Sequence, residues 1–266
     1  MEAIAGQLHE RQKKLTLRFR RISFAYKHSR PVFEELNLTI DAFPAVILGP
    51  NGAGKSTLLS LLCGQLEPES GAVVVDGVSE HTKRAVRTLR RRTGWLPQEV
   101  KALPGFTTRQ QVAYAGWLKG MGYKNAWANA LDALRRVDLE ASINRPSGSL
   151  SGGQRRRLGV AQALVVNPQY LVLDEPYAGL DPEQRSVMRG TLQDLSDSCQ
   201  IVTLTHQTDD LEDIYRWVVI LESGHVHFSG STQDFYVYAL PETPSSLKAE
   251  LAYRNVLKER RAGTPA

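Results

Sequence analysis

One eight-residue stretch, GPNGAGKS at positions 49–56, restricts the fold of this chain more than any other feature. It matches the pattern G-x-x-x-x-G-K-[ST], in which glycines let successive backbone N–H groups turn toward a phosphate. The continuous apolar run Ala45–Leu48 precedes it, as expected of a buried parallel strand. Lys55 and the leucines after it begin a helix, whose N-terminal dipole favours an anion. The order strand, loop, helix therefore predicts a phosphate cradle.

The residues of this cradle have distinct predicted roles. Lys55 would bring a compact positive charge to the β- and γ-phosphates of a nucleotide. The Ser56 hydroxyl can ligate Mg²⁺, and Thr57 can donate to the α-phosphate. Kinases, GTPases and motor ATPases share such a loop, so the rest of the chain must distinguish among them. The surrounding backbone would come from Gly49, Pro50, Asn51, Gly52, Ala53 and Gly54.

Two acidic residues end an apolar stretch farther along the chain, in LVLDE at positions 171–175. A carboxylate at the end of a strand can hold Mg²⁺, directly or through water, which fits Asp174. Glu175 would then be placed to polarise an attacking water. Taken alone, the two acids fit a strand end before a polar turn equally well, because Pro176 breaks the strand. Downstream of a phosphate cradle, they favour a metal ligand and a general base.

A second glycine-containing turn, LSGGQ at positions 150–154, repeats the chemistry of the first. Its two glycines precede a helix expected over Arg155–Val166, and Ser151 can cap that helix. An ordinary capped helix start is the plain explanation of this turn. A second anion site in the same chain is the functional one.

Apolar periodicity predicts an α/β fold. Strands that alternate with helices indicate a mostly parallel sheet covered on both faces. A helical stretch at about 99–150 interrupts the alternation and is expected to be an insertion. The predicted strands are Leu15–Tyr26, Phe33–Ile40, Ala45–Leu48, Ala72–Val75, Tyr170–Leu173, Ile201–Thr205 and Trp217–Leu221. Helices are predicted from Lys55 onward and over Thr108–Lys119, Asn125–Val137, Glu183–Leu195 and Asp209–Tyr215.

Composition favours a folded chain without a membrane span of its own. Of the 266 residues, 42% are hydrophobic and 23% are charged, which is ordinary for a soluble protein. No apolar run approaches the roughly 20 residues that a spanning helix needs, and no secretory signal is visible. We therefore expect a cytoplasmic protein that another chain would hold at a membrane.

The net charge of +5 suits nucleic acid, anionic lipid or a nucleotide, and charge alone does not choose among them. Basic residues gather in one run. A solvated helix face is the default explanation of that run, and contact with a membrane-embedded partner is the sharper one. Its members are Arg84, Arg87, Arg90, Arg91 and Arg92.

Three motifs occur in the order of the nucleotide-binding subunit of an ABC transporter, which this chain resembles over about residues 15–230. They are GPNGAGKST at 49–57, LSGGQ at 150–154 and LVLDEP at 171–176. Shorter matches are Gln98 in LPQE, Asp181 in AGLDP and His206 in LTH.

The resemblance implies an α/β P-loop NTPase core with a mostly parallel sheet, over residues 15–98 and 151–230. It also implies an N-terminal antiparallel β subdomain and an inserted α-helical subdomain at about 99–150. The ATPase domain would cover residues 15–240. Residues 1–14 and 241–266 are expected to be peripheral tails.

In this family, two such subunits stack head to tail around two ATP molecules. By resemblance, Ser151 and Gly153 of one subunit would close over the γ-phosphate of an ATP bound by the other. The neighbouring Gly152 and Gln154 belong to the same nucleotide-binding turn, and Asp181 would lie at the dimer seam.

The resemblance assigns the remaining site residues as well. Tyr26 would stack on adenine, although it is equally compatible with an ordinary strand position. Gln98 would touch Mg²⁺ or the lytic water, and His206 would contact the γ-phosphate. Asp174 would support Mg²⁺, and Glu175 would act as general base, which implies an active ATPase. Many relatives carry a smaller residue at the position of Tyr177.

The implied function is ATP hydrolysis that powers transport through a separate transmembrane permease, with a second ATP-binding subunit and no nucleic acid. The segment Leu96–Met121 looks like the ABC-2-type exporter branch, so we predict export from the inner face of the cell membrane. Two alternatives stay open at this point: an ABC importer ATPase, and a soluble ABC ATPase of the iron–sulfur assembly type.

Overall fold

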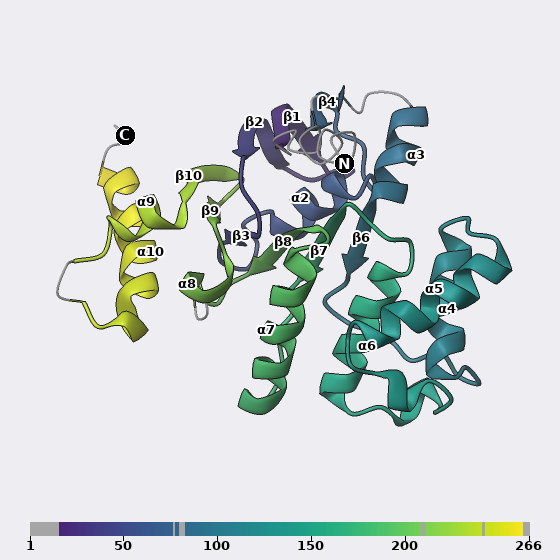
Figure 1. The fold of residues 1–266 in the computed structure, drawn as a ribbon. Coiled ribbons are helices and arrows are strands. Elements are labelled where there is room, and N and C mark those ends of the chain that lie inside the picture. Colours follow the sequence, from purple (N-terminus) through teal and green to yellow (C-terminus); the bar gives the residue numbers. More distant parts are fainter. Residues whose placement is uncertain (1–15, 77, 80–82, 209–210, 241–242, 263–266) are drawn as a thin grey trace, which may run out of the picture.

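The computed structural model describes residues 16–76, 78–79, 83–208, 211–240 and 243–262 (Figure 1). The predicted tail at 1–14 lies outside these residues, as do Leu15, the first two residues of the helix predicted from Asp209 and both ends of the 241–266 segment. No helix in the part of the chain that is described has the length and apolar character needed to cross a membrane.

The smaller of two sheets is antiparallel, with strand order β2-β1-β4-β5. Inward-facing residues of β1, among them Leu17, Phe19 and Ile22, are buried, as the alternating pattern predicts. The expected N-terminal antiparallel subdomain is therefore present. Its strands are β1 (Leu17–Ala25), β2 (Pro31–Ile40), β4 (Ser70–Val75) and β5 (Val78–Ser79).

The larger sheet has the order β10-β9-β3-β8-β7-β6. Its strands from β9 to β6 pair in parallel, and β10 runs antiparallel at one edge. The predicted mostly parallel sheet is thus confirmed. The strands are β3 (Ala45–Leu48), β6 (Thr93–Leu96), β7 (Tyr170–Asp174), β8 (Gln200–Thr205), β9 (Trp217–Glu222) and β10 (His225–Ser231).

Two strands of the larger sheet, β6 and β10, were not predicted. The sequence of β6 is only four residues long and contains a glycine, so it shows no usable period. The sequence of β10, HVHFSGS, is largely polar because this strand lies at an edge and is only partly buried. Both strands form because a neighbouring strand supplies hydrogen-bond partners.

Both faces of the larger sheet are covered. Along β3, Val46 and Leu48 enter one hydrophobic core, whereas Ala45 and Ile47 enter the other. Figure 1 places the smaller sheet on one side of the molecule and the helices α4, α5 and α6 on another. The helices are α2 (Lys55–Leu62), α3 (Lys83–Arg92), α4 (Thr108–Leu118), α5 (Tyr123–Arg135), α6 (Gly152–Leu164), α7 (Pro182–Ser196), α8 (Leu211–Ile214), α9 (Thr232–Tyr236) and α10 (Ser245–Ala262).

Helices between β6 and β7 form the predicted α-helical insertion. Thr107 caps α4 in a reciprocal arrangement with Gln110, which confirms the expected start of that helix. The helix expected over Arg155–Val166 is α6, and it begins three residues earlier, at Gly152. The predicted fold class, a P-loop NTPase core with an antiparallel β subdomain and a helical insertion, is confirmed.

The sheet order brings distant motifs to one edge. Neighbouring parallel strands end in register, with Leu48 of β3 beside Thr205 of β8, and Leu96 of β6 beside Leu173 of β7. Because carboxyl ends of parallel strands meet at the same edge, the segments that follow these strands converge. Those segments carry the phosphate-loop, Gln98, acidic and His206 motifs.

Candidate functional site

A cavity of about 250 Å³ opens at this edge of the sheet. Its lining combines the phosphate loop with the segments that follow β6 and β7. All lining residues except Val32 belong to the set predicted from the sequence. They are Val32, Pro50, Asn51, Gly52, Gly54, Lys55, Ser56, Thr57, Gln98, Asp174 and Glu175.

Two glycines of the loop have a steric reason to be glycine. A Cβ built on Gly49 would lie 2.1 Å from the Leu221 carbonyl oxygen, so the loop leaves β3 in direct contact with the end of β9. Gly54 precedes α2 with a φ of 98°, a left-handed conformation that side chains disfavour. No side chain caps α2, so the N-terminal end of the helix faces the cavity without a competing group. Gly49 and Ala53 support the loop and do not line the cavity.

The Lys55 side chain is buried within the loop. Its ammonium donates to the carbonyl oxygens of Gly49 and Pro50, the second at 3.0 Å. Burial lowers the pKa of Lys55, and the nearby carboxylates of Glu175 and Asp174 partly oppose that shift. The cavity therefore holds a positive charge between a phosphate loop and two acids.

Ser56, Gln98 and Asp174 bring a hydroxyl, an amide and a carboxylate to the same cavity. Burial raises the pKa of Asp174, and the adjacent Glu175 charge raises it further, while Arg156 and Lys55 act in the opposite direction. Such oxygen donors are those that Mg²⁺ prefers, and a cation would favour the charged form of Asp174. The donor set fits the predicted metal.

Glu175 is the most tightly oriented acid of the site. Its Oε2 accepts a hydrogen bond from the Thr205 hydroxyl at 2.9 Å. Its Oε1 accepts one from the His206 backbone N–H at 3.0 Å and lies 2.7 Å from Nδ1 of the same residue. A carboxylate fixed by three groups can present a defined lone pair to a water molecule.

His206 lies next to the cavity, although it does not line it. Its ring is about half exposed and contacts Glu175. Thr205, which was not predicted as a site residue, also contacts Glu175 through its hydroxyl. A hydroxyl residue at the last position of a strand, directly before His206, was the signal that could have identified it.

Tyr26 follows β1 and touches the phosphate loop from outside the cavity lining. Its hydroxyl lies 3.2 Å from the Thr57 hydroxyl, and its ring meets Phe24 edge to face. The residue is 47% exposed, so part of it stays accessible to solvent beside the loop.

The LSGGQ turn lies apart from this cavity. Ser151 accepts from the Gln154 backbone N–H at 3.3 Å, and the Gln154 side chain accepts from the Ser151 N–H at 3.1 Å. Gly153 packs against Gln184, while Ser151 and Gly152 are exposed. The nearby Asp181 caps α7 through the Gln184 backbone N–H. None of the four predicted residues of the turn lines this cavity.

Arg156 is a second residue that the sequence did not single out. Its side chain is buried directly behind the acids and donates to their backbone carbonyls. Nothing in the sequence around it, RRRLG, distinguishes this arginine from its neighbours.

Comparisons with known proteins agree with this geometry. Residues 33–178 match the protein family described as ABC transporter. The methionine import ATP-binding protein MetN of Caulobacter vibrioides is 32% identical over 231 residues, which cover 85% of this chain and 70% of that protein.

Solved structures give the same result. The cbiO1 protein from Clostridium perfringens, part of the ABC transporter complex cbiONQ, has a TM-score of 0.74 at 26% identity, over 91% of this chain and 98% of that chain. A dimeric post-hydrolysis state of the ATP-binding cassette MJ0796, bound to ADP and Pi, has a TM-score of 0.69 at 25% identity, over 81% and 98%. This chain is an ATP-binding subunit of the ABC transporter family.

Proposed function

We propose that this chain binds MgATP in the cavity described above and hydrolyses it, and that it does so in a dimer that powers a membrane-spanning permease. One observation carries the proposal. Glu175, oriented by Thr205 and His206, shares a cavity with the phosphate loop and with oxygen donors suited to Mg²⁺.

Each group has a defined task in this proposal. Lys55 and the N-terminal end of α2 attract the β- and γ-phosphates. Ser56, Gln98 and Asp174 would hold Mg²⁺, which when bound offsets phosphate charge. Glu175 accepts a proton from the attacking water, and His206 stands beside it, near the γ-phosphate. Tyr26 offers its exposed ring to the adenine.

The position of the LSGGQ turn supports the proposal that the chain acts as a dimer. Ser151 and Gly152 are exposed and lie outside the chain's own cavity, so they are accessible to a nucleotide held by another subunit. We propose that the partner is a second copy or a close relative, stacked head to tail. The similar MJ0796 cassette is itself described as dimeric.

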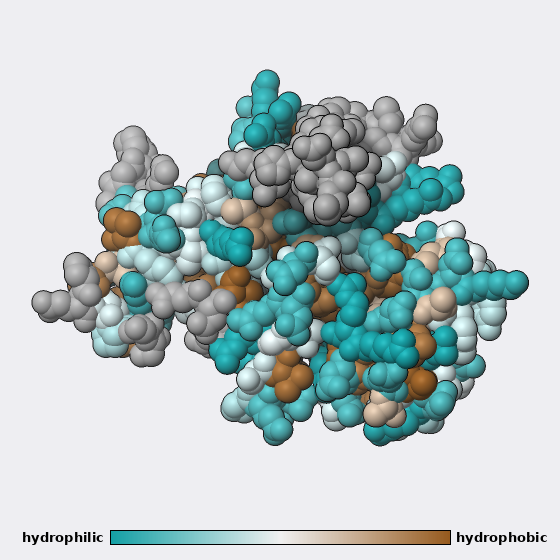
Figure 2. All heavy atoms as spheres, in the orientation of Figure 1, coloured by the Kyte–Doolittle hydropathy of each residue, from teal (hydrophilic) through white to brown (hydrophobic). Residues whose placement is uncertain are grey.

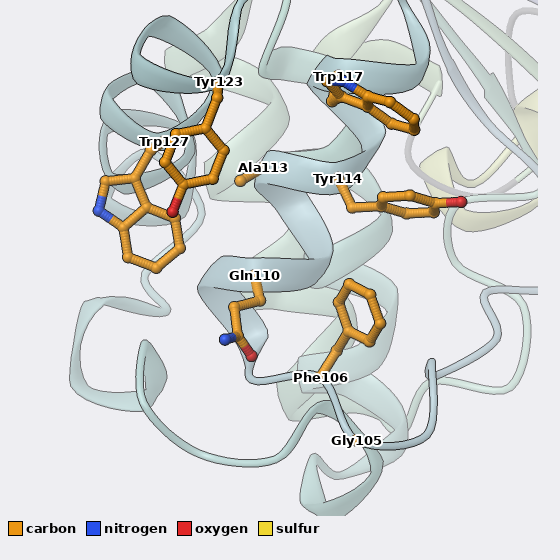
Figure 3. A pocket seen from close by; sticks show the side chains of 8 residues that line it. All are labelled: Gly105, Phe106, Gln110, Ala113, Tyr114, Trp117, Tyr123 and Trp127. Carbon is orange, nitrogen blue, oxygen red and sulfur yellow. The ribbon is translucent and has the colours of Figure 1, made fainter.

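An aromatic groove on the helical insertion is the observation that supports a permease as partner. It has a volume of about 510 Å³ (Figure 3). Trp117 and Tyr123 are 56% and 71% exposed and line the same groove, and apolar residues that gather on a surface mark interaction sites. Hydrophobic residues also reach the surface of this region in Figure 2. The groove is lined by Gly105, Phe106, Gln110, Ala113, Tyr114, Trp117, Tyr123 and Trp127.

The groove is connected to the nucleotide site by a short path. Gln98 lies seven residues before Gly105 in the sequence, and Gln111 of α4 fixes the segment between them through Leu103 and Lys101. A shift of Gln98 would therefore reach the groove. We propose that the permease binds this groove and so holds the chain on the inner face of the membrane.

Export is the direction we propose, because the segment Leu96–Met121 looks like the ABC-2-type exporter branch. Import is the second candidate, favoured by the similarity to the import protein MetN. Reconstitution with the cognate permease distinguishes them. ATP supplied on the side of this chain should deplete substrate on that side for export and enrich it for import.

The central test is Glu175→Gln. This change keeps the shape of the side chain and removes the base, so nucleotide binding should be retained while turnover falls by about 100-fold or more. Phosphate release and nucleotide binding are measured in parallel, and size-exclusion chromatography with ATP should find the variant trapped as a dimer. Turnover equal to that of the unaltered chain would refute the assignment.

A further inference from the structure

Arg156 lies in the second turn of α6 with only 6% of its surface exposed. Its guanidinium donates to five backbone carbonyls. Nη1 bonds the oxygens of Pro97 and Gln98 at 2.6 and 2.8 Å. Nη2 bonds those of Asp174 and Glu175, the latter at 2.7 Å, and Nε bonds that of Pro176 at 3.3 Å. Five N–H donors are all that an arginine has, so every one is used.

The five carbonyls belong to two segments. Pro97 and Gln98 follow β6, and residues 174–176 end and follow β7. The parallel ladder between these strands ends at the pair Leu96 and Leu173. Beyond that pair, one guanidinium joins the two segments where their backbones no longer bond each other in the ladder.

These segments carry three of the side chains that line the cavity, those of Gln98, Asp174 and Glu175. Glu175 also has a φ of 50°, a left-handed conformation that costs about 1 kcal/mol for a residue other than glycine. Such a conformation persists only when its surroundings fix it. The hydrogen bonds from Arg156 to the carbonyls on both sides of that residue provide such a constraint.

We propose that Arg156 is a positioning residue that holds Gln98 in register with Asp174 and Glu175, and so sets the geometry in which water is activated. The inference rests on the proposed ATPase function. Arg156 touches neither nucleotide nor metal in this proposal, because its hydrogen bonds go to backbone oxygens behind the cavity.

Charge and shape both require arginine here. Burial lowers the pKa of Arg156 to about 10, with Asp174 and Glu175 opposing the shift, so the side chain stays charged at neutral pH. A planar fork can reach two segments at once, whereas a lysine offers three donors from a single point. Lysine should therefore replace it only in part.

Arg157 provides a matched control on the same helix. It is buried to a similar extent, 7% exposed, and donates to the backbone oxygens of Val137 and Asp138 and to the Asp138 carboxylate. All three contacts lie just after α5, outside the nucleotide cavity. Its loss should cost stability without disturbing Gln98 or Glu175.

The experiment compares Arg156→Gln, Arg156→Lys and Arg157→Gln with the unaltered chain, measuring kcat, KM for ATP and the thermal midpoint. Arg156→Gln should lower kcat by about 10- to 100-fold, as expected for a group that orients site residues, and Arg156→Lys should lie between. KM should change little, because Arg156 makes no hydrogen bond to the phosphate loop. Arg157→Gln should keep kcat near that of the unaltered chain.

The inference would be overturned by an equal loss of kcat in Arg156→Gln and Arg157→Gln, or by a loss of ATP affinity with kcat preserved. If Arg156→Gln fails to fold, kcat of Arg156→Lys against Arg157→Gln decides the question. If the unaltered chain is active and Glu175→Gln is inactive, but both Arg156 variants keep full activity, this inference alone is refuted. A chain whose turnover does not depend on Glu175 would refute the proposed function and this inference together.

Discussion

The GPNGAGK and LSGGQ turns each precede a helix, α2 and α6, and they differ in what satisfies the N-terminal ends of these helices. At α2 no side chain caps the helix, and the preceding loop lines a cavity with Lys55 inside it. At α6 Ser151 and Gln154 cap the helix reciprocally, and the turn is exposed. The first turn is thus a site prepared within its own chain. The second turn has its helix end capped by its own side chains, and its serine, Ser151, is exposed at the surface.

This difference shows that the residues around a glycine-containing turn, and not the turn alone, decide what the turn can bind. The α2 turn has Gln98, Asp174 and Glu175 around it, because the sheet brings them there. The α6 turn does not line the cavity that holds these residues. Under the proposed function, the metal ligands and the base for a nucleotide at this turn would come from the other subunit. Four substitutions test this asymmetry.

The largest effect is expected for Lys55→Ala. Removing the buried ammonium takes away the charge that the phosphates would meet, so turnover should fall by about 100-fold or more and ATP affinity should fall with it. Phosphate release and nucleotide-binding fluorescence measure the two effects. Lys119→Ala is the control, since Lys119 also donates to two backbone carbonyls, those of Arg90 and Thr93. Normal ATP affinity in Lys55→Ala would remove the distinction between the two turns.

Ser151→Ala should have a smaller and different effect. Each chain should still bind ATP at α2, while turnover falls because the turn can no longer close on the partner's phosphate. Loss of the cap should also cost about 1 kcal/mol of stability, measured by urea unfolding. ATP binding that falls as it does in Lys55→Ala would contradict the proposed division.

Mixing the two variants sharpens this test. In a mixed dimer of Lys55→Ala and Ser151→Ala chains, one site combines an intact loop with an intact turn from the other chain. Mixing should therefore restore part of the turnover that each variant lacks alone. No recovery, in chains that can be cross-linked as mixed dimers, would mean that both turns act within one polypeptide.

The smallest effects are expected on the free energy of unfolding, when Gly49 and Gly152 are each replaced by alanine. A Cβ at Gly49 would meet the Leu221 carbonyl at 2.1 Å, so Gly49→Ala should destabilise the fold by about 1–3 kcal/mol. A Cβ at Gly152 would meet nothing within 4 Å, so Gly152→Ala should change stability by less than about 0.5 kcal/mol. Urea unfolding of both variants gives the comparison. Equal losses would show that the α6 turn is as confined as the α2 loop.

Much of the fold could be predicted because its signals are local. The alternation in β1, the apolar run of β3 and the Thr107 cap of α4 each lie within a few consecutive residues. Strands β6 and β10 escaped prediction because short or edge strands take their conformation from a neighbour. Residues of the site with a predicted role in a motif were found in the same way. Thr205 was missed although it precedes His206 in LTH, and Arg156 lies in a run of three arginines that does not distinguish it.

The sequence by itself determined the chemistry: a phosphate loop, a strand that ends in two acids, and a helix whose N-cap is a serine. Only the tertiary structure decided which of these share a cavity. Parallel strand order gathers Lys55, Gln98 and Glu175 at one edge and leaves Ser151 outside. The physical reason is that this arrangement depends on backbone hydrogen bonds between distant segments, and backbone carbonyls, such as the five that Arg156 binds, leave no pattern in the order of side chains.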